Sequence, residues 1–178
     1  MKKIALWVEG ASDRRFFDAI IKPKLERHFD VVKIVEYSVR FSQVNKLLQS
    51  MSHQGFEYLF VADQDETPCI SARREKLQKR FPALEPTRIV VVGREIEAWY
   101  VAGLGKDAAL GLRMKSLSQD CETKEQFLKL IAEPFTSSVD LMVEILQVFD
   151  YQLACEKNRS FAYFDSKLKW IVQASNRP

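Results

Sequence analysis

The sequence has few of the residues on which zinc sites and disulfide-rich domains depend. Among its 178 residues there are three cysteines and two histidines. The cysteines, Cys69, Cys121 and Cys155, form no C-x-x-C pair, so neither a disulfide framework nor a zinc knuckle is expected. His28 and His53 each lie alone near the end of an expected helix, which does not favour zinc ligation.

Long apolar runs are also missing. No stretch approaches the roughly 20 apolar residues that a membrane-spanning helix needs. The opening Met-Lys-Lys-Ile-Ala-Leu-Trp-Val is basic and then apolar, but the apolar run stops at Glu9, too early for a signal peptide. We therefore expect a first strand here and a cytoplasmic protein with no membrane partner. With 47% hydrophobic and 29% charged residues, the composition is that of a folded domain.

The glycine-rich motifs of common nucleotide-binding folds are absent. The segment VEGASDRRF has neither the G-x-G-x-x-G of dinucleotide binding nor the G-x-x-x-x-G-K-[ST] of a phosphate loop. No G-x-S-x-G is present for a hydrolase, and no histidine is suitably placed beside a serine or cysteine nucleophile. The order of the acidic residues also differs from that expected of a phosphoryl-accepting receiver domain.

Strand and helix signals alternate over the first hundred residues. Helices are expected after Gly10, from a cap at Ser42 to Gly55, and over 71–81. Four short apolar runs predict strands at 3–8, 31–35, 57–62 and 88–92. This alternation predicts an α/β fold, with a mostly parallel sheet of about four strands and helices on both faces.

After Gly93 the strand signal stops and helical patterns follow. Thr123 and Gln126 form a capping-box pattern at the start of one expected helix. Helices are expected in REIEAWYVAG and over 123–132, 138–149 and 161–174. We therefore predict an α/β domain over residues 1–103 and a helical extension over 104–178 that packs on the same domain.

Acidic residues follow three of the four expected strands. Glu9 follows the first strand, Asp63 and Asp65 follow the third in VADQDETP, and Glu95 and Glu97 follow the fourth. The carboxyl ends of parallel strands lie at one edge of a sheet, where α/β proteins bind their ligands. Converging carboxylates repel one another unless a cation lies among them, and oxygen ligands suit Mg²⁺ or Mn²⁺. A metal site is predicted, although each acid alone also fits a turn, cap or helix-dipole role.

Basic residues gather close to these acids. The net charge is only +3, but residues 71–94 hold seven basic residues against two acidic ones. One interpretation is a solvated helix face, and the other is a phosphate-binding patch beside the acidic site. The second interpretation makes Arg14, Arg73, Arg74 and Arg94 the candidate phosphate ligands.

Two of these segments resemble motifs of the Toprim fold, which topoisomerases, primases and the overcoming-lysogenization-defect nucleases share. LWVEGASDRRFF is similar to the family's first motif, and LFVADQDETP to its D-x-D motif. The resemblance implies that Glu9, Asp63 and Asp65 hold Mg²⁺ or Mn²⁺. It also implies nuclease-like chemistry on phosphodiesters. For a second metal or a general base, Glu97 is our candidate, with Glu95 nearly equal.

The later segments EIEAWYVA and NRSFAYF resemble small Toprim-like proteins of unknown function that are related to those nucleases. The sequence departs from the topoisomerases, because Glu66 follows the D-x-D at once and no nucleophilic tyrosine is recognisable. Strand passage is therefore not expected. Among relatives an ATPase neighbour is common, so the resemblance implies an ATPase partner and a role in phage defence or DNA repair.

Three functional hypotheses remain open from the sequence. The first is a metal-dependent nuclease in which Glu9, Asp63, Asp65 and Glu97 are catalytic. The second is a non-catalytic subunit that binds nucleic acid or an ATPase, and the third is a small-molecule phosphohydrolase. Trp99 fits either packing against the sheet or, with its neighbour Tyr100, stacking on a base. The sequence leaves the oligomeric state open, a dimer included.

Overall fold

The sheet has four parallel strands in the order β2-β1-β3-β4. The computed structural model describes residues 1–114, 123–131 and 135–176. Register is regular, with Lys3 beside Val31 of β2 and beside Phe56 of β3. The strands are β1 (Lys3–Val8), β2 (Val31–Glu36), β3 (Phe56–Asp63) and β4 (Ile89–Val92). The predicted α/β class with a mostly parallel sheet is confirmed.

Helices connect the strands, and the described residues after β4 form helices joined by loops. Between the strands lie α1 (Ala11–Phe16), the π-helical η1 (Phe17–Ile21), α2 (Lys22–Leu25), the 3₁₀ segment η2 (Ser38–Gln43), α3 (Val44–His53), α4 (Ile70–Arg80) and the 3₁₀ turn η3 (Pro86–Arg88). After β4 come α5 (Glu97–Ala102), α6 (Lys106–Gly111), α7 (Lys124–Lys129), α8 (Ser138–Gln147), α9 (Tyr151–Lys157) and α10 (Arg159–Ser175). Among the described helices, none is both long and apolar enough to cross a membrane.

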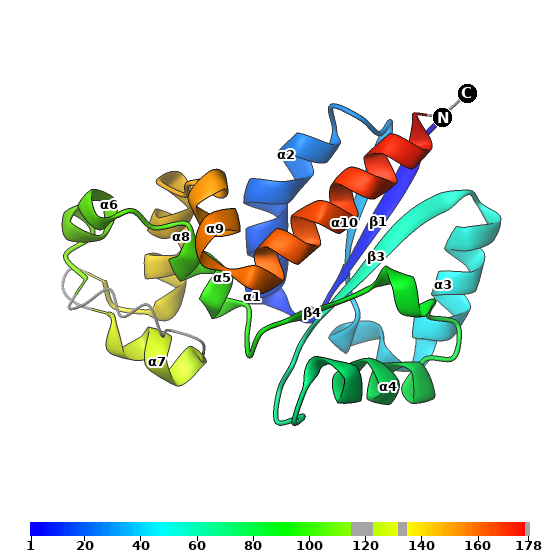
Figure 1. Ribbon diagram of the computed structural model, residues 1–178, viewed down its shortest axis with the longest axis horizontal. Coiled ribbons are helices and arrows are strands. Elements are labelled where there is room, and N and C mark those ends of the chain that lie inside the picture. Colours follow the sequence, from blue (N-terminus) through cyan, green and yellow to red (C-terminus); the bar gives the residue numbers. More distant parts are fainter. Residues whose placement is uncertain (115–122, 132–134, 177–178) are drawn as a thin grey trace.

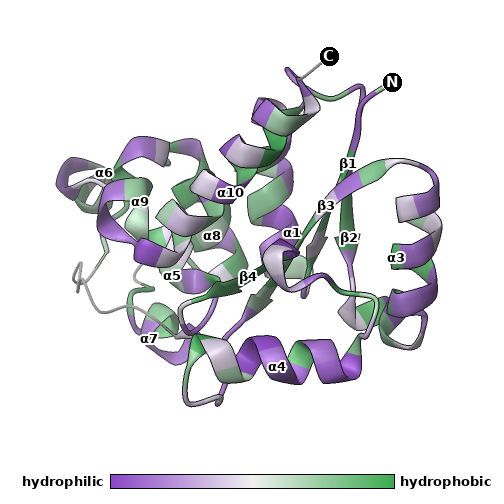
Figure 2. Ribbon diagram, turned by 45° about the vertical axis from the view of Figure 1, so that its right-hand side comes forward, coloured by the Kyte–Doolittle hydropathy of each residue, from purple (hydrophilic) through white to green (hydrophobic). Residues whose placement is uncertain are grey.

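The two faces of the sheet are covered by different helices. Alternate residues of β1 point to opposite faces, so Leu6 packs with α1, α5 and α10, whereas Trp7 packs with α3 and α4. Figure 1 shows α3 and α4 on one side of the sheet and α2 and α10 on the other. In Figure 2 the strands are largely green and α4 is largely purple, as expected for a buried sheet under a solvated helix.

The described helical residues after residue 104 share the larger of these two hydrophobic clusters with the sheet. Phe161 and Phe164 of α10 and Ile145 of α8 are fully buried there together with Leu6. The end of α10 returns to the start of the chain, where Lys2 Nζ donates a hydrogen bond to Asn176 Oδ1 at 2.6 Å. The division at residue 103 stays a prediction.

Several local predictions need correction. Ser42 does not cap α3, because η2 intervenes and Gln43 takes the capping position without a side-chain hydrogen bond. The helix expected from Arg94 begins only at Glu97. The short helices α6 and α9 were not predicted, since six or seven residues show little periodicity. The capping box of Thr123 is confirmed.

Gly103 lies where α5 ends against the aromatic cluster. A Cβ atom here would lie 2.2 Å from Cε2 of Phe149, whose ring packs edge-on against Phe16 at a centroid distance of 5.2 Å. We expect Gly103→Ala to lower the free energy of unfolding by about 1–3 kcal/mol, because the aromatic cluster must shift. Gly111→Ala is the control, since no atom of the described residues would lie within 4 Å of its Cβ. Urea unfolding of both variants tests this, and equal stabilities would contradict it.

Candidate functional site

The strand order places the acidic residues at the switch point of the sheet. The chain passes from β1 to β2 on one side and then crosses back to β3 on the other side of β1. In open α/β sheets, ligands bind at the carboxyl ends of the strands where the order reverses. Glu9 follows β1 and Asp63 ends β3, so both lie at this point, and β4 brings Glu97 to the next position.

Asp63 and Asp13 are the least compensated carboxylates of the site. Asp63 is half-buried and Asp13 is 4% exposed, and the Oδ1 atom of each is buried without a hydrogen-bond partner among the described residues. The other oxygen of Asp13, Oδ2, accepts a hydrogen bond from the backbone N–H of Gly10 at 3.2 Å. A buried ionised carboxylate without full hydrogen bonding is costly, so a cation beside these two oxygens would be stabilising.

Burial and mutual repulsion raise the pKa values of both groups. For Asp13, desolvation and the charges of Glu9 and Glu97 raise the pKa to about 7. For Asp63, burial first and then the charges of Asp13 and Glu9 raise the pKa well above its ordinary value. The carboxylates of Glu9, Asp13, Asp63 and Glu97 therefore act on one another, and of these four only Asp13 was not predicted as a site residue.

Glu9 is held by two neighbours rather than left facing the other acids. Tyr37, at the end of β2, donates a hydrogen bond from its hydroxyl to Glu9 Oε2 at 2.6 Å. The guanidinium of Arg73, from α4, lies 3.4 Å from the same oxygen. Tyr37 is itself buried, and its ring stacks on Phe60 of β3 at a centroid distance of 4.5 Å. The packing of Tyr37 on the sheet therefore fixes the position of Glu9.

Asp65 takes its position from a tight turn. Its φ is +51°, in the left-handed region that aspartate tolerates better than most residues. The turn is closed by Thr67, whose backbone N–H and hydroxyl both donate to the carbonyl of Gln64. The Asp65 carboxylate then faces Arg73 Nη2 at 2.8 Å. Arg73 is therefore a buried cation, 7% exposed, between Glu9 and Asp65 rather than a surface residue.

The two glutamates after β4 separate. Glu97 is 5% exposed, and burial together with the charge of Glu95 raises its pKa. Glu95 instead turns toward α7, where its Oε2 accepts a hydrogen bond from the backbone N–H of Lys124 at 2.5 Å. Of the two, Glu97 belongs with the carboxylates at the switch point, whereas Glu95 is engaged at the helical extension.

The carboxylates have the right chemistry to bind a hard divalent cation, but their side chains are not arranged around a common metal position. In the ranges 1–114, 123–131 and 135–176, no three acidic, histidine or cysteine side chains are grouped as metal ligands. The donors are carboxylate oxygens, as Mg²⁺ and Mn²⁺ prefer, and in the described part of the chain Oδ1 of Asp13 and Oδ1 of Asp63 are buried without a hydrogen-bond partner. The guanidinium of Arg73 takes the place between Glu9 and Asp65. The fit to a metal thus depends on these two acids leaving Arg73.

The other predicted phosphate ligands lie around this centre. Arg14 forms ion pairs with Glu36 at 3.1 Å and Asp18 at 3.2 Å on the exposed side of α1. Arg74 donates from Nη2 to the hydroxyl of Tyr163 at 3.1 Å. Arg94 is exposed, with a φ of +65°, in the loop after β4. Their role in phosphate binding stays a prediction.

The EIEAW and NRSF segments meet inside the protein. Trp99 is fully buried, and its Nε1 donates to Ser160 Oγ at 2.8 Å. Ser160 Oγ donates in turn to Oδ1 of Asn158, the residue that caps α10. Tyr100 is also fully buried, with its hydroxyl on the carbonyl of Ser12 at 2.8 Å. The base-stacking interpretation of Trp99 and Tyr100 is therefore wrong. Both rings pack inside the larger hydrophobic cluster.

Sequence reasoning missed Asp13 and Tyr37 as site residues. From the sequence, Asp13 is only one of two candidate caps, with Ser12, for the helix after Gly10. The E-x-x-x-D spacing from Glu9 was the available signal, because a strand end and the first turn of the next helix lie at the same edge. Tyr37 carried no such signal, since its contact with Glu9 depends on β2 lying beside β1.

By sequence, the chain matches no protein-family model and none of the curated proteins. By structure, it is similar to the C-terminal region of the Burkholderia pseudomallei OLD protein, with a TM-score of 0.50 and 18% sequence identity. The similarity covers 98% of this chain and 99% of that one, so it includes the helical part as well as the sheet. This chain therefore has an OLD-like α/β fold with a C-terminal helical part.

Proposed function

We propose that this chain is a Toprim-type, divalent-metal-dependent nuclease that hydrolyses phosphodiester bonds of nucleic acid. The observation that carries the proposal is the pair Asp13 and Asp63 at the switch point of the sheet, each with a buried Oδ1 atom that has no hydrogen-bond partner among the described residues. Such a pair is costly in a protein with no ligand, and perturbed carboxylates at a sheet edge are typical of functional sites. The likeness to the OLD protein region is consistent with it.

Each carboxylate has a role in this proposal. Glu9, Asp13, Asp63 and Asp65 would hold Mg²⁺ or Mn²⁺. The bound ions would supply Lewis-acid activation of water and neutralise charge at the scissile phosphate. Glu97 is the proposed general base, because it lies among these carboxylates and burial raises its pKa above the ordinary value of a glutamate. Arg73, once released from Glu9 and Asp65, is placed to bind a phosphate oxygen.

The test is metal-dependent cleavage with matched binding data. Plasmid, single-stranded DNA and RNA are incubated with wild type in Mg²⁺, Mn²⁺ or EDTA, beside Asp63→Ala/Asp65→Ala. We expect cleavage only with metal and wild type, and Mn²⁺ binding that the variant has lost. Cleavage that persists in the variant, or in EDTA, would refute the proposal. Phosphate release from nucleotides with nucleic acid left intact would instead indicate a small-molecule phosphohydrolase.

A second function is favoured by Arg73. Because its guanidinium already neutralises Glu9 and Asp65, the same fold is compatible with a non-catalytic subunit. Such a subunit would bind nucleic acid or the ATPase partner expected from the Toprim resemblance. Affinity for DNA or RNA with no cleavage in either metal would support this second function over the first.

A further inference from the structure

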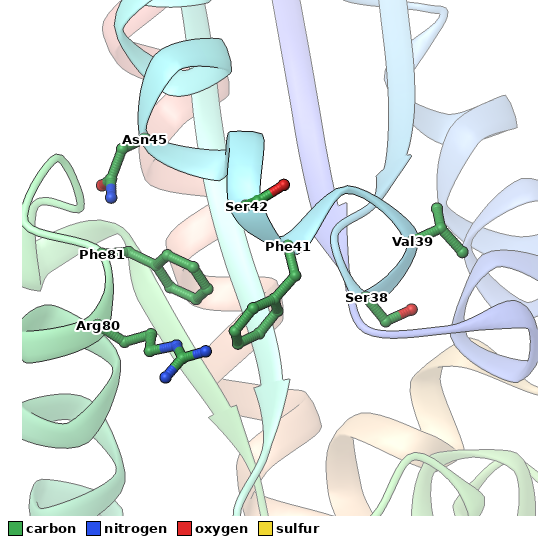
Figure 3. A pocket seen from close by; sticks show the side chains of 7 residues that line it. All are labelled: Ser38, Val39, Phe41, Ser42, Asn45, Arg80 and Phe81. Atoms are coloured by element: carbon green, nitrogen blue, oxygen red, sulfur yellow. The ribbon is translucent and has the colours of Figure 1, made fainter.

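A cavity of about 520 Å³ opens beside the acidic site, between η2 and the end of α4 (Figure 3). Its position follows from the sheet, because η2 begins directly after Tyr37, the residue that holds Glu9. The backbone N–H of Ser38 also donates to the carbonyl of Glu9 at 3.2 Å. Ser38, which lines the cavity, is therefore in direct contact with the backbone of Glu9. It is lined by Ser38, Val39, Phe41, Ser42, Asn45, Arg80 and Phe81.

An exposed aromatic ring forms the centre of this cavity. Phe41 is 40% exposed, although its ring packs edge-on against buried Phe81 at a centroid distance of 5.0 Å. The guanidinium carbon of Arg80 lies 4.5 Å from the centroid of Phe41. Figure 3 shows the two rings and the guanidinium next to one another. Aromatic rings and guanidinium planes are the groups on which unstacked bases pack.

The charge around the cavity suits a polyanion. Helix α4, which ends in Arg80, holds five basic residues and one acidic residue, and η2 adds Arg40. The cavity lining contains no acidic residue, and Ser38, Ser42 and Asn45 provide hydroxyl and amide groups. An apolar protein surface would leave these polar groups and Arg80 without suitable partners, so a nucleic acid fits the lining better.

We propose that this cavity is a base-stacking subsite for single-stranded nucleic acid, whose backbone follows basic α4 to Glu9 and Asp63. A base of a single strand would pack on Phe41 and Arg80, which a base stacked inside a duplex cannot do. The inference rests on the proposed nuclease function and specifies that its substrate is single-stranded nucleic acid. It concerns surface residues that lie outside the carboxylate cluster, so the two are separable by experiment.

The test compares two oligonucleotides of about 12 units that carry the same phosphates. One is oligothymidylate, and the other is the same backbone with abasic sugars throughout. Fluorescence anisotropy in EDTA measures binding without cleavage. We expect wild type to bind oligothymidylate about 5- to 150-fold more tightly than the abasic strand, as one stacked base provides. Phe41→Ala should remove this difference, and Phe41→Tyr should retain it.

Trp170→Ala is the matched control. Trp170 is 53% exposed and has the guanidinium of Arg88 at 5.3 Å from its ring, but it lies on α10 outside the cavity. Its removal should leave the preference for oligothymidylate unchanged. Because Phe41 is largely at the surface, thermal unfolding of Phe41→Ala should show that the fold is kept.

The outcomes separate this subsite from the proposed function. If wild type binds both strands equally but still cleaves nucleic acid with Mn²⁺, the subsite is refuted and the nuclease stands. Failure to bind either strand, with no cleavage, refutes both. If light scattering shows a dimer that Phe41→Ala dissociates, with the base preference intact, the cavity is a contact between copies of the chain and the proposal is overturned.

Discussion

Asp13→Asn and Asp63→Asn should make the metal-free protein more stable above neutral pH while abolishing its binding of Mn²⁺. In the wild type each carboxylate must be ionised in a buried position beside other acids, which asparagine avoids. The asparagine at position 13 also keeps the oxygen that accepts the hydrogen bond from Gly10. We expect Asp63→Asn to gain about 1–3 kcal/mol in the free energy of unfolding at pH 8, the cost of an unsatisfied buried group.

The gain should depend on pH with a defined sign. The pKa of Asp13 is raised in the folded state from 3.8 to about 7. The folded protein therefore binds the proton more tightly than the unfolded chain. The contribution of protonated Asp13 to the free energy of unfolding is fully present below about pH 4, and it is lost as the pH rises through about 7. The advantage of Asp13→Asn over wild type should accordingly grow across this window by about 4 kcal/mol at most.

Urea unfolding of wild type and variants from pH 5 to pH 8 measures this difference, first in EDTA and then in Mn²⁺. Mn²⁺ at about a hundredfold excess over its dissociation constant should stabilise wild type by about 2.7 kcal/mol and leave both variants unchanged. Glu66→Gln, an exposed acid in the same loop as Asp65, is the control and should behave as wild type. Equal stabilisation of wild type and Asp63→Asn by Mn²⁺ would refute the metal site.

Arg73→Met should have opposite effects on the metal-free and the metal-bound protein. Without metal, Glu9 and Asp65 lose their cation, and we expect the free energy of unfolding to fall by about 1–3 kcal/mol. The lower part of this range is favoured, because both acids are partly exposed and water can replace some of the interaction.

With metal, the same substitution should raise affinity. In the wild type, Glu9 and Asp65 must leave the guanidinium before they bind a cation, and the variant has no such competition. A displacement cost on the order of 1–2 kcal/mol corresponds to about 5- to 30-fold tighter Mn²⁺ binding. Cleavage of nucleic acid should nevertheless fall, since the proposed phosphate ligand is gone.

Arg74→Met is a matched control for Arg73→Met. It removes the same charge from the next position of α4, but this guanidinium contacts Tyr163 rather than the carboxylates. Mn²⁺ titration by calorimetry should show an unchanged affinity for Arg74→Met. If Arg73→Met weakens Mn²⁺ binding, Arg73 orders the acids for the metal instead of competing with it, and the expectation is wrong.

Much of the architecture was accessible from local patterns. The apolar run of β1, the alternation of strand and helix signals that placed α4 between two strands, and the capping box at Thr123 all predicted what the structure shows. The metal-ligand candidates Glu9 and Asp63 were also accessible, because the carboxyl ends of parallel strands lie at one edge whatever the strand order. That geometry depends only on the strands being parallel.

The sequence predicted less well which side chains are buried. Arg73 lies in a strongly basic helix, which is typical of a solvated face, yet it is enclosed by the β3–α4 turn and Glu9. Conversely, Trp99 and Tyr100 had a base-stacking alternative, whereas the packing of α10 and α1 encloses both rings. The exposure of a residue depends on which elements pack over it. The hydrogen-bond partners of Trp99 and Tyr100 lie 61 and 88 positions away in the sequence.

The sequence by itself thus determined the α/β class, the strand-end positions of Glu9, Asp63 and Asp65, and the oxygen-rich chemistry of the site. Only the tertiary structure decided that β1 lies beside β3, that Asp13 joins Asp63 in burial and that Arg73 lies between Glu9 and Asp65. Periodicity and turn signals act over a few residues, and a sequence expresses them directly. Strand order and the neighbours of a buried charge depend on the packing of the whole sheet with its helices, which no local pattern contains.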